Sequence, residues 1–410
     1  MNIAPIPPST SPPLPLETPP AARTAVFIGS GQYRRPSYGR NHPLAIPRVS
    51  LTFDLLNAYG ALSRDEILQA RKAADFELEW FHTREYVAAI KRAEALGRVR
   101  HEHRERHRLG TLENPYFAQF FTTPATATGA SIQAAEAVLD GRLAFNPAGG
   151  MHHARPDAAQ GFCYFNDVAL GILRLRQAGL RVAYVDIDAH HCDSVEAAFA
   201  SDANVLTLSL HMDTSYAYPG AGGRLQDTGS PEAGHTTINV PLPRDVNDAE
   251  YRLMVEAVVP RAFQRFRPDA VVLQAGTDMI AGDPLGKWRL ATETFLHAAD
   301  VVIAAAPRNG GGVPALMATG GGGYHPILLA RAWAGLWGLL SGRELATAIP
   351  AEGQTLLRAV GWEGDDDDDE DDAFGDRVYT SRLDGRPMAP ARPHLLALRD
   401  RVLEHPFLQR

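Results

Sequence analysis

The sequence predicts a three-layer α/β/α fold in which helices cover both faces of a mainly parallel central sheet. Short and nearly continuous apolar runs, such as Arg181–Asp186 and Ala270–Gln274, recur along the chain. They alternate with longer stretches that have the three-to-four-residue apolar spacing of helices. Continuous apolar runs are typical of strands buried on both faces, as in parallel sheets.

The individual elements follow from this pattern in chain order. A first strand at Thr24–Gly29 precedes two helices at Ser50–Tyr59 and Arg64–Ala73, where apolar residues have helical spacing. Apolar runs then predict strands at Leu143–Asn146, Arg181–Asp186, Val205–Ser209, Ala270–Gln274 and Pro314–Ala318. Helical periodicity predicts helices at Gly129–Leu139, Asp167–Gln177, Val195–Ala200, Ala249–Arg265 and Ile327–Ser341. Ligands bind at the carboxyl ends of the strands in such sheets, so the polar residues after these runs are the first candidates for a site.

Length and composition indicate a globular protein. The chain has 410 residues, of which 45% are hydrophobic, and this is enough to fill a sizeable core. Because Cys163 and Cys192 are the only cysteines, no disulfide framework can organise the chain, and we expect a reducing compartment, the cytoplasm. The apolar runs are shorter than the roughly twenty residues that span a bilayer, so we expect a soluble protein without a membrane partner.

Two segments depart from globular composition. The first twenty residues hold eight of the thirty prolines and no Lys or Arg, which predicts a disordered, Pro-rich leader at 1–23. Ten of the 48 acidic residues lie within 363–376, which leaves 38 acidic against 40 basic residues elsewhere. We interpret this run as an acidic flexible loop, followed by a C-terminal segment at 377–410. The nearly neutral remainder lacks the basic field that direct nucleic-acid binding needs.

The segment VAYVDIDAHHCDSVEAAF carries the first candidate site. Asp186, Asp188 and His190 occupy every second position where a buried strand ends, so an extended backbone would project all three to one side. Carboxylate oxygens and imidazole nitrogens are common zinc ligands. An ordinary structural explanation is also open, because Asp193 followed by Glu196 is a good capping box for the next helix.

Asp278 lies in a second segment of the same kind, after an apolar strand and a turn of small residues. An aspartate in this position is more often a turn or cap residue, so its weight comes from agreement with the first segment. Asp188, His190 and Asp278 would give three protein ligands. Three ligands leave one coordination position for water and substrate, which distinguishes a catalytic zinc site from a structural one.

Two further segments supply groups for proton transfer and hydrogen bonding. His152 and His153 follow three small residues, and an imidazole pair suits proton transfer near neutral pH. Asp186 and Asp193 are the carboxylates that we expect to orient this pair. The glycine run before Tyr324 lacks the Lys-Ser/Thr of a phosphate-binding loop. Tyr324 is therefore a candidate donor to a developing oxyanion, with ordinary packing as the alternative.

These segments, in this order and spacing, resemble the histone deacetylase superfamily, which includes bacterial acetoin-utilisation proteins and acetylpolyamine amidohydrolases. The resemblance covers residues 24–345 and extends to milder features near His42 and His82. It implies an arginase-like fold, with 24–410 as a single deacetylase-like catalytic domain. It also implies zinc-dependent hydrolysis of an acylated amine, such as N-acetyl-lysine in a protein, by metal-activated water.

The same resemblance implies roles for individual residues. The ligands of one zinc ion per chain match Asp188, His190 and Asp278. The tandem histidine pair and its carboxylates match His152, His153, Asp186 and Asp193, and the carbonyl-polarising tyrosine matches Tyr324. The substrate channel is implied to involve Gly161, Phe162, Tyr218, Leu285 and the substrate-gripping Glu113. A structural K⁺ ion is implied at Asp186 and Ser209, with backbone oxygens from Asp188, His190 and Leu210.

Two residues depart from the family pattern. Where the family usually has His-His-Gly-Asp-Gly, this chain has Cys192 and Ser194 in place of both glycines. If either glycine needs a positive φ, the loop must relax or bear strain. We interpret Cys192 as a buried thiol, with a redox-sensitive position or an adventitious metal ligand as alternatives.

Three other functions stay open at this point. The same metal chemistry would serve a hydrolase of acetylpolyamines or other small amides. A non-catalytic module that binds acyl-lysine is a second alternative, supported only by the two departures. An arginase-like dimanganese hydrolase is a third, although a second complete ligand set is missing from the sequence. The sequence does not determine the oligomeric state.

Overall fold

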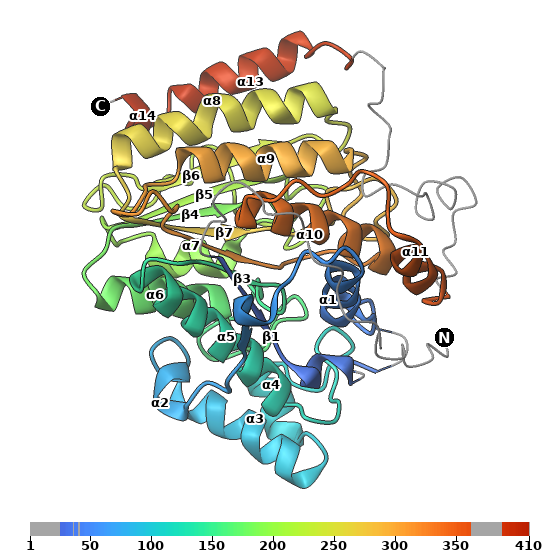
Figure 1. The fold of residues 1–410 in the computed structure, drawn as a ribbon. Coiled ribbons are helices and arrows are strands. Elements are labelled where there is room, and N and C mark those ends of the chain that lie inside the picture. The colour runs from blue at the N-terminus through green and yellow to red at the C-terminus, as the bar shows by residue number, and fades with distance from the viewer. Residues whose placement is uncertain (1–24, 36, 40–41, 362–387, 410) are drawn as a thin grey trace.

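The structure is a computed structural model that describes residues 25–35, 37–39, 42–361 and 388–409 (Figure 1). The predicted leader at 1–23 and the predicted acidic loop at 363–376 lie outside the described residues. Of the predicted C-terminal segment at 377–410, the structure describes 388–409.

Eight strands form one sheet in the order β2-β1-β3-β8-β7-β4-β5-β6. All the pairings between neighbouring strands are parallel, which confirms the predicted parallel sheet. The strands are β1 (Ala25–Gly29), β2 (Ile67–Gln69), β3 (Leu143–Asn146), β4 (Val182–Asp186), β5 (Val205–Met212), β6 (Thr237–Leu242), β7 (Ala270–Gln274) and β8 (Leu316–Thr319).

Helices cover both faces of the sheet, as Figure 1 shows. One face packs against α1 (Arg48–Ala58), α8 (Asp248–Phe266), α9 (Thr292–Ala305), α10 (Pro326–Ser341) and α11 (Ala351–Arg358). The other face packs against α5 (Thr122–Leu139), α6 (Asp167–Gln177) and α7 (Asp193–Phe199). Outside these layers lie α2 (Asp75–Leu78), α3 (Arg84–Leu96), α4 (His101–His107), α13 (Pro393–Leu403) and α14 (Pro406–Gln409), and 3₁₀ turns span Gly31–Arg34 and Arg64–Glu66.

One predicted helix is wrong. Residues 64–73 form a 3₁₀ turn followed by β2, which pairs with β1 through Phe27 and Ile67. A capping box between Ser63 and Glu66 closes the turn, and the chain then extends along the sheet edge. The strand has only three residues, too few to show an alternating pattern, whereas hydrogen bonds to β1 fix its extended conformation.

Four adjacent strands in the middle of the sheet, β3, β8, β7 and β4, deliver the candidate site from their carboxyl ends. β3 leads to the histidine pair, β8 to the glycine run, β7 to Asp278 and β4 to Asp188 and His190. Segments that are far apart in the sequence therefore meet at one edge of the sheet, as expected for a parallel α/β fold.

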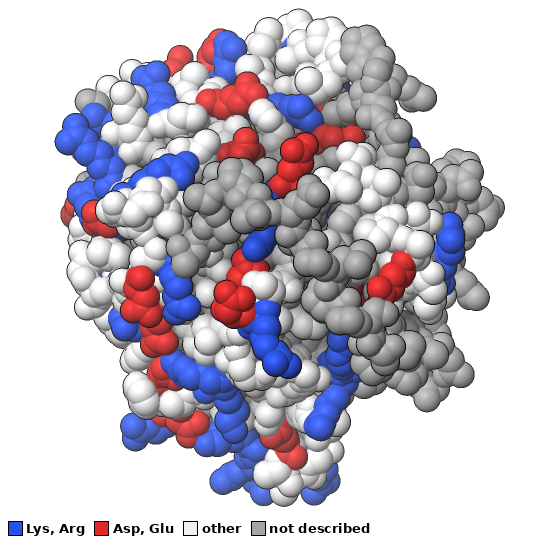
Figure 2. All heavy atoms as spheres, in the orientation of Figure 1, with Lys and Arg blue, Asp and Glu red and all other residues white. Residues whose placement is uncertain are grey.

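The exterior of the molecule has a mixed distribution of charge on the face that Figure 2 draws. Acidic and basic side chains are interspersed over the lower part of the face in Figure 2, where α2, α3 and α4 lie. Within the described residues, no helix has the length and apolar character needed to cross a membrane.

Candidate metal centre and active site

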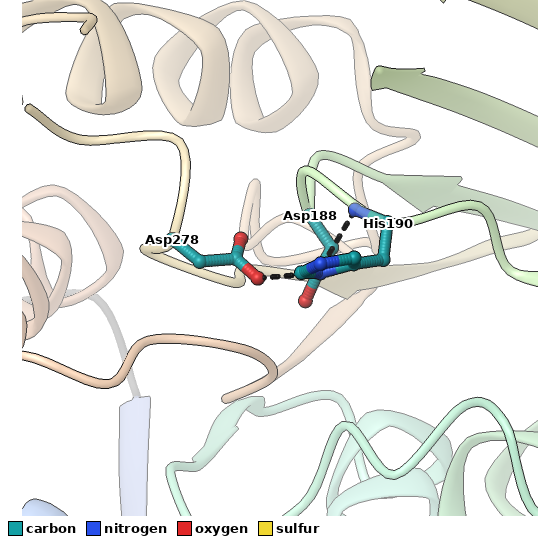
Figure 3. A group of neighbouring side chains, drawn as sticks. All are labelled: Asp188, His190 and Asp278. Atoms are coloured by element: carbon teal, nitrogen blue, oxygen red, sulfur yellow. Dashed lines mark hydrogen bonds and ion pairs between the residues drawn. The ribbon is translucent and has the colours of Figure 1, made fainter. Parts of the chain in front are cut away.

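Asp188, His190 and Asp278 converge on one point at the carboxyl edge of the sheet (Figure 3). One potential ligand atom from each lies within 4.8 Å of the others. His190 Nδ1 is 2.8 Å from Asp278 Oδ2 and 3.1 Å from Asp188 Oδ1. The two carboxylates are buried, while the side chain of His190 is 12% exposed. This exposure leaves one side of the group open to the surface.

Neighbouring groups hold both carboxylates in place. The side-chain amide of Gln274 and the backbone N–H of Gly322 donate to Asp188 Oδ2, at 2.8 and 2.6 Å. The backbone N–H of Ala189 donates to Asp278 Oδ1 at 2.9 Å. Hydrogen bonds of this kind orient metal ligands and fix which oxygen faces the ion.

The electrostatics of the group fit a divalent cation. Burial and the adjacent Asp188 carboxylate raise the pKa of Asp278 to about 7. Burial lowers the pKa of His190, but Asp278 and Asp188 outweigh it and raise that pKa overall. Two carboxylates so close together in a low-dielectric site repel each other unless a proton or a cation lies between them. Oxygen and nitrogen ligands in this number suit zinc.

The histidine pair lies beside this group, with each imidazole bound to its own carboxylate. His152 Nδ1 donates to Asp186 Oδ2 and His153 Nδ1 donates to Asp193 Oδ1, both at 2.7 Å. The two Nε2 atoms are 3.0 Å apart. The expected hydrogen bonds between the histidine pair and Asp186 and Asp193 are therefore present. They leave the two Nε2 atoms next to each other.

The two imidazoles have opposite protonation states at neutral pH. Burial lowers the pKa of His152, but the carboxylates of Asp186, Asp188 and Asp193 outweigh burial and raise that pKa to about 9. Burial and the positive charge of His152 lower the pKa of His153 to about 4. At pH 7, His152 is therefore cationic and His153 is neutral.

Glycines allow two loops to pass close to the reacting groups. A Cβ at Gly322 would lie 2.1 Å from an oxygen of Asp278, so the glycine run serves to bring backbone against the metal ligands. Gly161 has a φ of +56°, and a Cβ there would lie 2.5 Å from the ring of His153. A side chain at either position would displace the groups that the loop supports.

Two cavities surround these groups. A small cavity of about 20 Å³ is lined by His152, His153, Asp188, Tyr324 and other residues. A larger cavity of about 430 Å³ adjoins it, and the two share His153, Gly161 and Tyr324. We call this larger cavity the channel mouth. The mouth is lined by all the predicted channel residues, namely Glu113, Gly161, Phe162, Tyr218 and Leu285, and also by Tyr324.

Glu113 already has partners within the channel wall. Its Oε1 accepts hydrogen bonds from the backbone N–H of Gly161 and the hydroxyl of Tyr218, both at 3.0 Å. Its Oε2 accepts from Arg108 at 2.8 Å. The residue thus ties opposite walls of the mouth together, and its predicted contact with substrate backbone stays a prediction.

Cys192 and Ser194, the two departures from the pattern that the sequence resembles, fit the loop without a positive φ. Cys192 has a φ of −78° and is fully buried in the apolar cluster around α7. Ser194 lies in the first turn of α7, and its hydroxyl donates to the carbonyl of Ala154 at 2.8 Å. Neither residue has a positive φ, so the backbone here does not require glycine.

The predicted K⁺ residues also lie near one another. Asp186, the last residue of β4, is the register partner of Ser209 in the interior of β5. The Ser209 hydroxyl is 2.8 Å from His211 Nδ1, which is a contact that the sequence did not suggest. Ion binding at this position stays a prediction.

Sequence reasoning missed several groups that support the site. The hydroxyl of Tyr184 donates to Asp186, and the amide of Gln160 donates to Asp193 Oδ2 at 2.5 Å. Arg48 is buried, donates to the carbonyl of Gly321 at 2.5 Å and lines the small cavity. Tyr184 lies two residues before Asp186 on the same strand, so strand alternation was the signal that could have identified it.

This fold and this site define the class of the protein, a metal-dependent α/β hydrolase. Residues 42–340 match the histone deacetylase domain family. The chain is 36% identical to histone deacetylase 8 of Xenopus tropicalis over 305 residues, which cover 74% of this chain and 80% of that protein. It is 34% identical to histone deacetylase RPD3 of Saccharomyces cerevisiae over 338 residues, with 80% and 74% covered.

Solved structures agree with the sequence comparisons. The crystal structure of an HDAC homolog from Aquifex aeolicus has a TM-score of 0.85 and 35% sequence identity, and the match covers 93% of this chain and all of that one. An HDAC homolog complexed with SAHA gives the same TM-score at 36% identity. The chain belongs to the histone deacetylase family, and the predicted arginase-like, three-layer fold is confirmed.

Proposed function

We propose that the protein hydrolyses the side-chain amide of N-acyl-lysine in proteins, with one zinc ion held by Asp188, His190 and Asp278. The observation that carries this proposal is the small cavity around which a ligand carboxylate, two imidazoles and the Tyr324 side chain converge. One acyl carbonyl and one water would find there the groups that amide hydrolysis needs. Zinc in this site would supply a Lewis acid that polarises the carbonyl and acidifies water.

His153 serves as the general base and then the general acid. It is neutral at pH 7, because burial and the cationic His152 lower its pKa to about 4, and it can therefore accept a proton. The proton from water passes to His153, the hydroxide oxygen bonds to the acyl carbon, and the C–N bond breaks as the proton returns to the amine. His152 remains protonated and acts as an electrostatic partner, held by Asp186.

Tyr324 is the oxyanion donor. Burial, together with the carboxylates of Asp278 and Asp188, raises the pKa of its hydroxyl, so the proton stays on the oxygen at neutral pH. Its backbone N–H donates to Asp283 Oδ2 at 2.7 Å, which fixes the loop that presents the ring. Its hydroxyl would donate to the carbonyl oxygen as negative charge develops.

A protein substrate is favoured over a polyamine by the charge of the channel mouth. Glu113 is the one carboxylate among the described residues that line the mouth, and Arg108 neutralises it through an ion pair of 2.8 Å. Lys287 also lines the mouth. A polycation therefore meets no free acidic gate here, and an acylated polyamine remains the second candidate substrate.

A dimanganese arginase-like reaction is disfavoured by the contacts of the spare carboxylates. Asp186 and Asp193 would have to provide the second ligand set, yet they hold His152 and His153 at 2.7 Å. Among the described residues, Asp188, His190 and Asp278 make up the one cluster with metal-binding geometry.

Three further features belong to the same proposal. Residues 24–410 act as a single catalytic domain, and a K⁺ ion bound by Asp186 and Ser209 stiffens the end of the sheet beneath the site. The two free cysteines, both buried, suit the reducing cytoplasm.

The test is turnover of matched substrates by the wild type and by Tyr324→Phe. Acetyl-lysine peptides, peptides with longer acyl chains and acetylated polyamines are compared at equal concentration. Wild-type protein is expected to prefer acyl-lysine peptides, and Tyr324→Phe to lower kcat by about 10²–10³ with zinc content unchanged. Tyr116→Phe, a tyrosine that lines neither cavity, is the matched control. Near-wild-type turnover by Tyr324→Phe would refute the role of this hydroxyl.

A further inference from the structure

A second groove adjoins the mouth of the substrate channel. Its volume is about 680 Å³, and it lies between the loop that joins β6 to α8 and the loop that follows β7. The first loop contributes Arg244 and the second contributes Lys287 and Arg289. Tyr216 and Lys287 line both the groove and the channel mouth. A substrate whose acylated side chain enters the channel therefore places its adjacent residues beside this groove.

The three basic side chains of the groove are exposed and have no acidic partner among the described residues. No ion pair joins Arg244, Lys287 or Arg289 to a carboxylate in the described part of the chain. The Lys287 ammonium donates to the carbonyl of Pro284 at 2.6 Å, which leaves its charge uncompensated. Three positive charges thus converge on one hollow next to the active site.

The two carboxylates in the groove are already engaged. Asp245 forms an ion pair of 2.5 Å with Arg392, which precedes α13. Asp248 accepts hydrogen bonds from the backbone N–H of Ala291 and the hydroxyl of Thr294, at 2.9 and 2.5 Å. The Asp248 contacts hold the two loops together, and the Asp245 ion pair joins the first loop to the segment before α13. The groove therefore presents a net positive charge to any ligand.

Two exposed apolar side chains lie close to the mouth. Tyr216, which lines both the groove and the channel mouth, is 67% exposed. Leu112, which directly precedes the mouth residue Glu113, is 97% exposed. A peptide that crosses the mouth would cover both side chains.

We propose that this groove binds an acidic side chain that lies close to the acylated lysine, so that the enzyme selects acyl-lysine sites with a neighbouring Asp or Glu. The inference rests on the proposed function, because it concerns residues that flank the hydrolysed lysine. Arg244, Lys287 and Arg289 are the specificity-determining residues. The same charges disfavour acylated polyamines, whose free amines would be repelled.

The experiment uses pairs of acetyl-lysine peptides that differ only by Glu or Gln, placed in turn at each of the two positions on either side of the lysine. We expect kcat/KM to be higher for Glu at one or more positions, by up to about fivefold for each cation contacted. The preference should act mainly through KM and shrink in 0.5 M NaCl. Arg244→Gln/Arg289→Gln should reduce the Glu-to-Gln ratio towards one. The control Arg308→Gln, in the loop that precedes β8 at the amino-terminal ends of the strands, should preserve the ratio.

Binding of the same peptides separates this proposal from the proposed function. Fluorescence anisotropy with a neutral label and the Tyr324→Phe protein measures the Glu-to-Gln affinity ratio without turnover. A ratio near one at every position, or a ratio that survives in Arg244→Gln/Arg289→Gln, overturns the groove proposal. If the acidic preference in binding depends on the two arginines but no peptide is hydrolysed by the wild type, the groove proposal holds and the proposed activity fails.

Discussion

Replacing Cys192 and Ser194 with glycine should lower the free energy of unfolding rather than relieve strain in the loop. Cys192→Gly and Ser194→Gly would give the His-His-Gly-Asp-Gly pattern that the sequence resemblance implies beside the metal ligands. Neither native residue has a positive φ, and both side chains are buried and in contact with neighbours. The glycines would thus remove contacts without removing strain.

The magnitude follows from those contacts. Loss of the buried Cys192 side chain costs about 1–2 kcal/mol in burial and packing, offset by a few tenths because glycine is tolerated at a helix N-cap. Loss of the Ser194 hydroxyl removes a hydrogen bond worth about 1 kcal/mol. The Ala154 carbonyl keeps its bond from Asn166, so it is not left unpaired. Glycine inside α7 adds about 0.5–1 kcal/mol.

Urea denaturation at pH 7.5 measures the free energies of unfolding. The double variant is expected to be less stable than the wild type by about 2–4 kcal/mol, with kcat/KM within about twofold because every ligand and imidazole is retained. Ala197→Gly, at an exposed position of the same helix, reports the cost of glycine alone. A double variant as stable as the wild type would refute the reasoning and would mean that Cys192 and Ser194 strain the loop.

Two other variants test groups outside the predicted site. Burial lowers the pKa of His82 to about 3, and its Nε2 accepts a hydrogen bond from the backbone N–H of Asn166. An unfolded histidine titrates near 6.5, so between these values the unfolded chain binds more protons and stability falls as the pH is lowered. Urea titrations from pH 7.5 to 5 measure this decline. We expect His82→Gln to flatten it by up to about 1.4 kcal/mol per pH unit below pH 6.5, and an unchanged slope would contradict this. Gln160→Leu removes the donor to Asp193 and should lower kcat about tenfold or more with zinc retained, whereas unchanged kcat would exclude a positioning role.

The local sequence pattern predicted the strands and helices at the centre of the fold, because burial determines both the apolar pattern and the structure there. The run Ala270–Gln274 forms β7 with those bounds, and Asp167–Gln177 forms α6 with those bounds. Strands buried on both faces must be continuously apolar, and that is visible without tertiary information. At the sheet edges this link is weak. β6 contains Pro241, which argues against a central strand but is tolerated at an edge, so the strand was missed.

The site residues also fall into two groups, those that the sequence located and those that depend on the tertiary fold. Asp188, His190 and Asp278 directly follow strands, so the sequence located them and topology brought them together. Gln160 lies on a loop whose course depends on the surrounding fold, and its bond to Asp193 spans 33 residues of sequence. The α9 helix was missed because apolar residues surround much of it, which hides the helical period. The convergence of like charges from separate loops, as in the basic groove, leaves no local pattern in the sequence.

Metal analysis combined with activity tests the central claim most directly. Purified active protein should contain one equivalent of zinc per chain. Dialysis against a chelator should abolish hydrolysis of an acetyl-lysine peptide, and one equivalent of zinc should restore it. Asp278→Asn should fail to retain the metal under the same conditions. Full hydrolysis by metal-free protein, or a requirement for two equivalents per chain, would contradict a single catalytic zinc at Asp188, His190 and Asp278.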